Sequence, residues 1–322
     1  MNPLRLPFFD ALDPARHVLV AGAGGGFDVF SGLPLYFALA ETGKTVSLAN
    51  LTFSNLPPDS AGRQLAPALV EVTADSEGSQ TYFPEKHLSQ WFRDRGKEFP
   101  VYCFHRVGPR PVTDAYNFLA DHLGFDTVIL VDGGTDSLMR GDEEGLGTPV
   151  EDMTSIAAAD ALDDAKVPRK LLACLGFGID TFHGVCHAHV LEAVADLARA
   201  GGYLGAFSLT PEMPAVRWFV EATEYVMEKT SARPSIVLTS ILSALEGHFG
   251  NHHRTDRTAG SELFINPLMA MYWCFRLPHV ARRVLYLDQI RHLEGFFDVQ
   301  FRIEQFRSQP TTNRRPWRDL PM

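Results

Sequence analysis

Short apolar runs that end in polar or glycine-rich loops recur along the chain, and a helical pattern follows most of them. This alternation constrains the fold more than any other feature. The runs expected to form strands are residues 17–22, 45–51, 101–104, 128–131, 171–177 and 203–209, with helices at about 33–42, 85–95, 111–123, 152–163 and 185–199 between them. Alternating strands and helices build a parallel sheet that is covered by helices on both faces. We therefore predict an α/β protein with a doubly wound, mostly parallel sheet.

The pattern becomes mostly helical near residue 235. We expect residues 1–307 to form a single α/β domain whose part 235–307 is mainly helical, including 268–284, followed by an extended tail at 308–322. A last helix, 287–306, would carry an apolar face wider than one packing stripe. Such a face indicates either packing on the chain's own sheet or pairing with a second copy, and we expect a homo-oligomer.

Composition narrows the classes of function. A net charge of -10 argues against a nucleic-acid partner, because phosphate backbones are bound by basic surfaces. No apolar run reaches the roughly 18 residues of a membrane span, so we expect no membrane partner. The four cysteines are far apart, and the N-terminal segment lacks the order of a signal peptide. We expect a cytoplasmic protein without a disulfide framework.

The stretch 126–152 changes abruptly from an apolar strand to an acidic loop that is broken by glycines. After Val131 it contains seven acidic residues and one arginine, Arg140. Asp132 stands directly at the strand end and is followed by Gly133 and Gly134, while Asp136 lies between small residues. A solvated acidic loop is the alternative, but this placement favours a functional loop that requires a cation.

Polar residues also follow the other predicted strands. Because the carboxyl ends of parallel strands lie at one edge of a sheet, we expect these side chains to surround one site. They are Asp28, Asn50, His105, Asp132, Asp136, Asp180, His183 and Ser208.

The first loop, GAGGGFD, is similar to a dinucleotide-binding fingerprint but departs from it. Counted from Gly22, the third small residue would fall where Phe27 stands, and Asn50 replaces the acid expected at the end of the second strand. NAD is therefore an unlikely cofactor. Gly24, Gly25 and Gly26 could still offer backbone N–H groups to an anion. The negative charge of Asp28 would repel a bare anion, but it is compatible with an anion that is bound through a metal ion.

Two histidine-containing segments remain open. His187 and His189 are most simply surface histidines of a helix. A turn that contains His252, His253, Arg254 and Arg257 either meets an anionic substrate or is only solvated.

Several motifs together resemble a known family. AGAGGGFDV, LANLTF, VDGGTDSLMRGDEEGLGTPVEDMTSI, LGFGID, ALEGHFG and NPLMAMYW, within about residues 15–290, are similar to the DUF1152 family of archaeal and bacterial proteins of unknown function. The resemblance implies a Rossmann-like fold and a divalent-metal-dependent phosphatase. It implies metal or substrate contacts at Asp28, Asp132, Asp136 and Asp142.

We therefore expect a Mn²⁺- or Mg²⁺-dependent hydrolase, most simply a phosphatase, that acts on a small anionic metabolite. Its metal ligands would be Asp28, Asp132, Asp136 and Asp142, and its catalytic residues Asp136, Arg140, His105 and His183. Its anion-binding residues would be Gly24, Gly25, Gly26, Asn50, Ser137 and Ser208. The alternatives are a metal-dependent lyase or cyclase that acts on a small carboxylate, and a non-catalytic nucleotide-binding protein.

Overall fold

A nine-stranded sheet forms the centre of the molecule, in the strand order β3-β4-β5-β2-β1-β6-β7-β11-β8. The structure is a computed structural model that describes residues 4–56, 62–79, 81–310 and 312–320. Its five central strands are parallel: β5 (Val101–Phe104), β2 (Thr45–Leu51), β1 (His17–Gly22), β6 (Thr127–Asp132) and β7 (Arg169–Leu175). Numbered by their sequence among themselves, these five lie in the order 3-2-1-4-5, which is that of a doubly wound sheet. The α/β prediction is confirmed.

Antiparallel strands extend both sides of this parallel centre. β4 (Leu69–Val72) and β3 (Arg63–Ala66) add to β5. β11 (Met271–Arg276) lies antiparallel between β7 and β8 (Tyr203–Ser208). β8 therefore runs in the same direction as β7 but is one strand removed from it.

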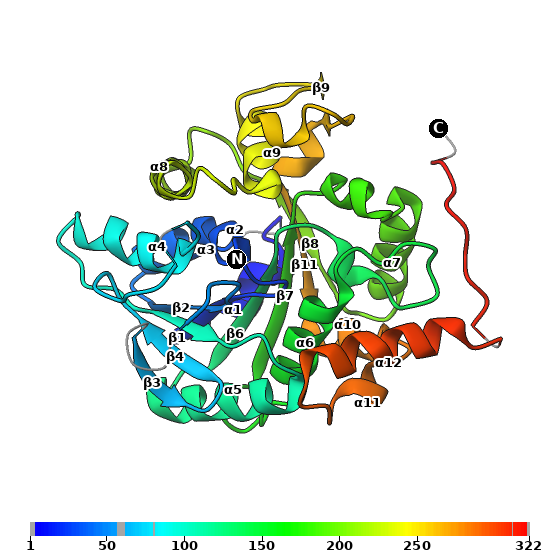
Figure 1. The fold of residues 1–322 in the computed structure, drawn as a ribbon, viewed down its shortest axis with the longest axis horizontal. Helices are drawn as coiled ribbons and strands as arrows, with labels where there is room; N and C mark the ends of the chain where they lie inside the picture. Colours follow the sequence, from blue (N-terminus) through cyan, green and yellow to red (C-terminus); the bar gives the residue numbers. More distant parts are fainter. Residues whose placement is uncertain (1–3, 57–61, 80, 311, 321–322) are drawn as a thin grey trace.

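Two hydrophobic cores cover the two faces of the sheet. Along β6, Val128 and Leu130 belong to one core while Ile129 and Val131 belong to the other, as the two-residue period of a strand requires. The first core is closed by α5 (Pro109–Leu123), α6 (Pro149–Asp160), α7 (His187–Arg199), α10 (Leu277–Arg283), α11 (Leu287–Ile290) and α12 (Phe296–Ser308). The second is closed by α1 (Pro7–Leu12), α2 (Asp28–Ser31), α3 (Leu33–Glu41), α4 (Pro84–Arg93), α8 (Pro214–Lys229) and α9 (Ile236–Leu245). Figure 1 shows the two helical layers above and below the sheet.

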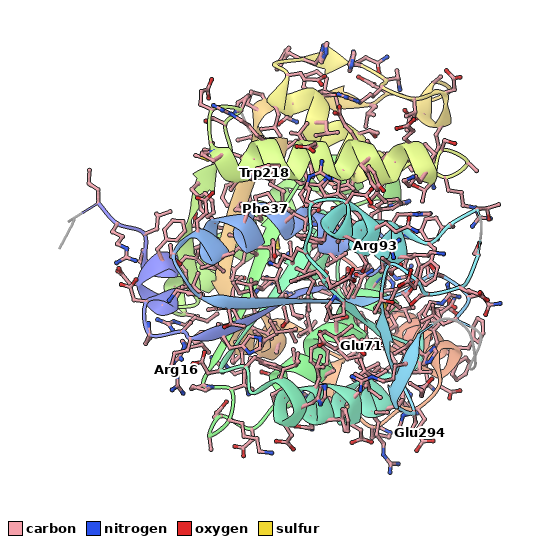
Figure 2. All side chains as sticks on the ribbon, turned by 90° about the vertical axis from the view of Figure 1, so that its left-hand side faces the viewer. Arg16, Phe37, Glu71, Arg93, Trp218 and Glu294 are labelled. Atoms are coloured by element: carbon pink, nitrogen blue, oxygen red, sulfur yellow. The ribbon has the colours of Figure 1, made fainter. Side chains whose placement is uncertain are left out.

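The second layer is itself two helices deep. α8 packs on α3 and α4, which in turn pack on the sheet. The Phe37 and Trp218 rings lie 6.4 Å apart between α3 and α8 (Figure 2). α9 and a small hairpin of β9 (Gly250–Asn251) and β10 (Phe264–Ile265) lie beyond the sheet at the α8 side (Figure 1).

The prediction that residues 268–284 are helical is wrong in its first part. Pro267–Ala270 is a short 3-10 helix, Met271–Arg276 is the strand β11, and within 268–284 only Leu277–Arg283 is α-helical. Tyr272 and Cys274 enter one core, whereas Phe275 enters the other. A strand buried on both faces shows no alternation of apolar and polar residues, so its sequence cannot be distinguished from a buried helix by periodicity.

The prediction of one helix over 287–306 is also wrong, because the chain leaves the helical path between α11 and α12. The carbonyl of Leu293 accepts a hydrogen bond from the Arg110 backbone N–H at 3.1 Å, and that of Glu294 accepts one from Gly108 at 2.7 Å. These two carbonyls therefore bind the start of α5 and not a following helical turn. On α12, Ile303 is buried, while Phe297 and Phe301 are 74% and 66% exposed.

A homo-oligomer that pairs through α12 stays a prediction. Changing Phe297 to Asp would place a charge in the centre of the exposed apolar pair while leaving buried Ile303 untouched. We expect wild-type protein at micromolar concentration to elute with the mass of at least two chains, and Phe297→Asp with the mass of one. Chromatography with light scattering measures both, and a wild-type mass of one chain would remove the oligomer.

Candidate metal centre

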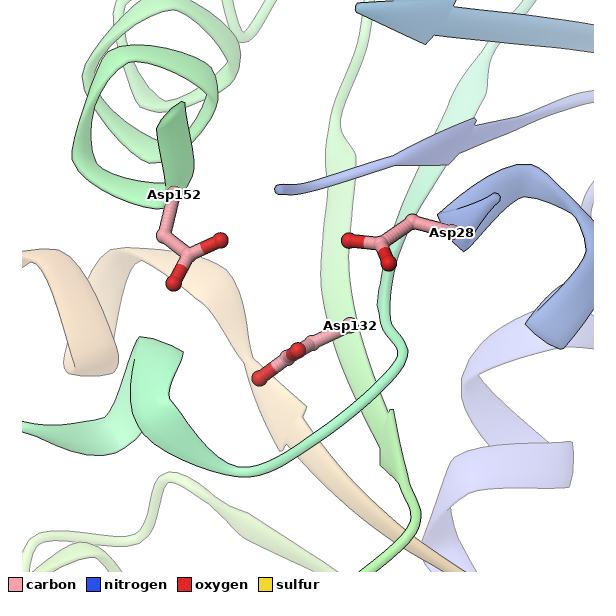
Figure 3. Close-up of side chains that lie close together, drawn as sticks. All are labelled: Asp28, Asp132 and Asp152. Atoms are coloured by element: carbon pink, nitrogen blue, oxygen red, sulfur yellow. The ribbon is translucent and has the colours of Figure 1, made fainter. Parts of the chain in front are cut away.

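Asp28, Asp132 and Asp152 form a cluster of carboxylates where the strand order reverses. β2 lies on one side of β1 and β6 on the other, so the loops after β1 and β6 diverge to opposite faces of the sheet, which is the position at which open α/β sheets bind ligands. Asp132 ends β6, Asp28 begins α2 on one face, and Asp152 lies in the first turn of α6 on the other. One carboxylate oxygen from each lies within 4.8 Å of the other two (Figure 3).

Backbone and hydroxyl groups orient two of these three carboxylates. Asp28 Oδ2 accepts a hydrogen bond from the Gly24 N–H at 2.6 Å. Asp132 Oδ2 accepts hydrogen bonds from the Ser137 N–H at 3.2 Å and the Ser137 hydroxyl at 2.5 Å. Asp152 Oδ2 is buried and has no hydrogen-bond partner among the described residues. Asp28 is the partly exposed member, so the cluster opens toward solvent on the Asp28 side.

Asp136 and Asp180 are two further buried carboxylates, and both accept hydrogen bonds from the loops near this cluster. Asp136 Oδ2 accepts hydrogen bonds from the Thr148 N–H at 2.7 Å and the Thr148 hydroxyl at 3.0 Å. Asp180 Oδ2 accepts one from the Thr135 N–H at 2.7 Å. These bonds fasten the loops that carry the cluster, and the two buried carboxylates add negative charge to it.

Burial and mutual repulsion disfavour the charged forms of these groups. Burial is the main cause that raises the pKa of Asp28 to about 7; the Asp136 charge raises it further, and the hydrogen bond from the Gly24 N–H opposes the rise. Burial, followed by neighbouring carboxylates, raises the pKa values of Asp132, Asp152 and Asp180 well above the usual range of an aspartate. No lysine, arginine or histidine among the described residues forms an ion pair with Asp28, Asp132 or Asp152. A bound cation would offset the repulsion among these carboxylates and favour their charged forms.

The glycine loop serves the fold more than an anion. The Gly24 N–H is donated to Asp28, and the Gly26 N–H to the Leu51 carbonyl at 3.0 Å. Gly25 has φ +90°, and a β-carbon there would lie 2.5 Å from the Leu51 carbonyl oxygen. The expectation that all three glycines present free N–H groups therefore fails for Gly24 and Gly26.

Asn50 has the same supporting function. It is buried, and its Nδ2 donates to the Gly26 carbonyl at 2.7 Å and to Glu85 at 2.8 Å. It fixes the glycine loop on β2. Ser137, another predicted anion contact, instead orients Asp132 as described above.

Within the described part of the chain, residues 140–144 of the acidic loop bond to arginines and not to the cluster. The Asp142 carboxylate accepts from Arg140 at 3.0 and 2.7 Å and from Arg315 at 2.9 Å. Arg315 also pairs with buried Glu143 and with Glu192. Arginines thus neutralise the predicted ligand Asp142, and the predicted catalytic Arg140 is engaged with it.

The remaining predicted residues lie apart from the cluster. His105 follows β5, two strands from β1, and burial lowers its pKa. His183 is exposed in the turn after β7, and Ser208 is exposed at the end of β8. No hydrogen bond joins any of these three side chains to Asp28, Asp132 or Asp152. Strand ends share an edge, but that edge is nine strands wide.

Sequence reasoning missed Asp152 as a member of the cluster. It lies 20 residues after Asp132, at the end of the acidic run. Its position in the first turn of the helix after that loop was a usable signal, because such a residue faces the loop from which the helix begins.

Comparison with known proteins identifies the family. The family model described as "Protein of unknown function (DUF1152)" matches residues 63–307. The chain belongs to this family. Asp132 and Asp152 lie within the matched part of this DUF1152 protein, and Asp28 precedes it. Searches of curated proteins and of solved structures gave no match. No helix in the described part of the chain has the length and apolar character that crossing a membrane requires.

Neutralising one carboxylate should stabilise the metal-free fold. The raised pKa values mean that the folded state holds these protons more tightly than the unfolded state, so stability is lost as pH rises from about 4 through about 7, the folded value of Asp28. We expect Asp152→Asn at pH 8 in a chelator to have a free energy of unfolding about 1–3 kcal/mol greater than wild type, and therefore a higher melting temperature. Thermal unfolding at pH 5 and pH 8 checks this, with a smaller difference expected at pH 5. A lower melting temperature for Asp152→Asn at pH 8 would contradict it.

The tail should be held by Arg315. Its side chain contacts Asp142, Glu143 and Glu192, and the Trp317 N–H donates to Glu144 at 2.7 Å. Replacing Arg315 with Ala leaves buried Glu143 without this partner, so we expect a loss of about 2–4 kcal/mol in the free energy of unfolding and faster proteolysis after residue 308. Arg314→Ala is the matched control, because Arg314 has no acidic partner within 4.0 Å among the described residues. Equal stability of the two variants would show that the tail contributes little.

Proposed function

We propose that this protein is a divalent-metal-dependent hydrolase that removes phosphate from a small anionic metabolite. One observation carries the proposal: three carboxylates from three elements converge within 4.8 Å at the strand-order reversal. Ligand sites of open α/β sheets lie in the crevice at this position. Buried Asp152 Oδ2, which lacks a partner among the described residues, is an independent sign that something else occupies the centre.

The donor atoms favour a hard cation. The group contains only carboxylate oxygens, without a histidine nitrogen or a cysteine sulfur. Cys174 is the nearby thiol, 3.4 Å from the Ser137 hydroxyl, and burial raises its pKa well above the usual range, so it remains protonated. Oxygen ligands suit Mg²⁺ or Mn²⁺ better than zinc.

The residues of the chain would position the cation and the substrate. Gly24 and Ser137 fix the orientation of Asp28 and Asp132, so these carboxylates need little rearrangement on binding. A cation held there would polarise a phosphoryl oxygen and lower the pKa of a bound water. Substrate would enter beside Asp28, the member that solvent reaches. In the reaction, a water oxygen bonds to phosphorus as the ester P–O bond breaks, and the leaving alcohol takes up a proton that the water releases.

Asp132→Asn should separate this function from a structural role. We expect the variant to bind Mn²⁺ at least about tenfold more weakly and to lose metal-dependent phosphate release, because one of three anionic ligands becomes neutral. Calorimetric titration with Mn²⁺ measures the binding, and a panel of phosphomonoesters with and without Mn²⁺ measures phosphate release.

Glu144→Gln is the matched control, since Glu144 comes from the same acidic stretch but is exposed and contacts the tail. It should bind Mn²⁺ as wild type does. Wild-type affinity for Mn²⁺ in Asp132→Asn would overturn the metal centre. Tight Mn²⁺ binding without phosphate release from any member of the panel would overturn the phosphatase and leave the lyase and binding-protein alternatives.

A further inference from the structure

A pocket lined by arginines lies at the start of α9, the helix whose first turn contacts the loop after Asp132. It has a volume of about 990 Å³ and lies between the end of α8, the start of α9 and the loop 254–257. Arg233, Arg254 and Arg257 line it together with the hydroxyl side chains of Ser231, Thr239 and Thr255. Glu228 and Asp256 also belong to the lining. Its size is that of a pocket for a small metabolite.

Two contacts reach the loops of the carboxylate cluster, one of them from the start of α9 beside this pocket. A β-carbon on Gly133, the residue after Asp132, would lie 2.8 Å from Asp28 Oδ1 and 3.1 Å from Val237 in the first turn of α9. On the other side, the Tyr82 hydroxyl lies 3.0 Å from where a β-carbon on Gly26 would be. The first turn of α9 and Tyr82 thus both reach the loops that carry the cluster.

Val237 lies in the sequence between Pro234 and Thr239, which both line the pocket. Because Val237 would contact a β-carbon on Gly133, the wall of the pocket at the start of α9 borders the loop after Asp132. The first turn of α9 therefore connects the pocket with the carboxylate cluster.

The pocket arginines differ in how far they are neutralised. Arg254 forms ion pairs with Glu224, at 2.8 Å, and with Glu246. Arg233 and Arg257 have no acidic partner within 4.0 Å among the described residues, and both are exposed. Arg257 donates one hydrogen bond to the Pro234 carbonyl at 2.6 Å, which leaves the rest of its guanidinium available. Two free guanidiniums in a chain of net charge -10 form a local exception to its acidic surface.

We propose that this pocket binds the second phosphate of a small molecule that carries two phosphate groups, while the first lies at the Asp28 centre. The assignment rests on the proposed function, because the carboxylate centre supplies the reacting end. Guanidiniums bind phosphate oxygens through paired, charge-assisted hydrogen bonds. The arrangement selects a bisphosphorylated metabolite over a monophosphate, which would leave Arg233 and Arg257 unpaired.

Inorganic pyrophosphate, titrated into full-length protein in a chelator, tests the pocket without the metal. We expect wild-type protein to bind it, with an affinity that falls as salt is raised. Arg233→Gln should weaken binding by about threefold or more, and Arg233→Gln with Arg257→Gln by about tenfold or more. Arg257→Lys keeps the positive charge and should bind pyrophosphate better than Arg257→Gln. This comparison distinguishes a role of Arg257 in binding the anion from a structural role through its hydrogen bond to the Pro234 carbonyl.

Two controls keep this result distinct from that of the metal centre. Arg282→Gln removes an exposed arginine of α10 that has no acidic partner among the described residues, and it should bind pyrophosphate as wild type does. Asp152→Asn should lose Mn²⁺ binding yet bind pyrophosphate in the chelator at least as well as wild type. Absence of pyrophosphate binding at about 1 mM, or binding unchanged in the double variant, would overturn the pocket even where Mn²⁺ binding and phosphate release stand. Conversely, arginine-dependent binding of pyrophosphate with undiminished Mn²⁺ binding by Asp152→Asn would overturn the metal centre alone.

Discussion

Repulsion among buried carboxylates is the constraint around which the centre of this molecule is built. Asp28, Asp132 and Asp152 come from different elements, and Asp136 and Asp180 lie around them. Bringing such charges together without a cation opposes folding, so the surrounding sheet must provide the stability that holds them in place. The strands beneath them are apolar and fully buried on both faces, as is typical of the central strands of a parallel sheet. A rigid core of this kind can maintain an unfavourable arrangement of charges at its edge.

Among the described residues, arginines pair with the outer part of the acidic loop and not with Asp28, Asp132 or Asp152. Arg140 and Arg315 neutralise Asp142 and Glu143 in the outer part of the acidic loop. Arg307 donates to the carbonyls of Glu143 and Glu144 in the same loop. The acidic stretch therefore has two parts: an outer part bound by arginines from α12 and the tail, and an inner part that no arginine in the described part of the chain neutralises.

The fold was largely predictable because its signal is local. Each parallel strand is a short apolar run, and its carboxyl end is marked by a glycine or a polar residue, so β1, β2, β5, β6 and β7 were found and their common edge followed. β11 was missed because burial on both faces removes the alternation of apolar and polar residues on which such a prediction depends. The break between α11 and α12 was missed because it depends on hydrogen bonds to the start of α5, nearly 200 residues earlier in the chain.

The candidate site was predictable only in part, for the same reason. Asp28 and Asp132 could be found because both follow strands that are neighbours in the sheet. Asp142 could not be excluded from sequence, because the residue that neutralises it, Arg315, lies 173 residues away. The hydrogen-bond partners of Asn50 and Ser137 could not be predicted, because both are polar residues at strand ends, where a side chain that supports a loop and one that binds a ligand have the same local pattern.

The order of the strands also shows why the centre cannot be assigned to the matched part of the chain alone. The family model covers residues 63–307, yet β1 and β2 lie in the middle of the sheet, between β5 and β6. Without them, β5 and β6 would have no strand between them, and Asp132 would lose the neighbouring loop that carries Asp28. The carboxylate at the open side of the centre thus comes from a segment outside the match. The sheet and the centre are therefore one physical unit, and any ligand that enters beside Asp28 contacts the N-terminal strand–loop–helix together with the matched region.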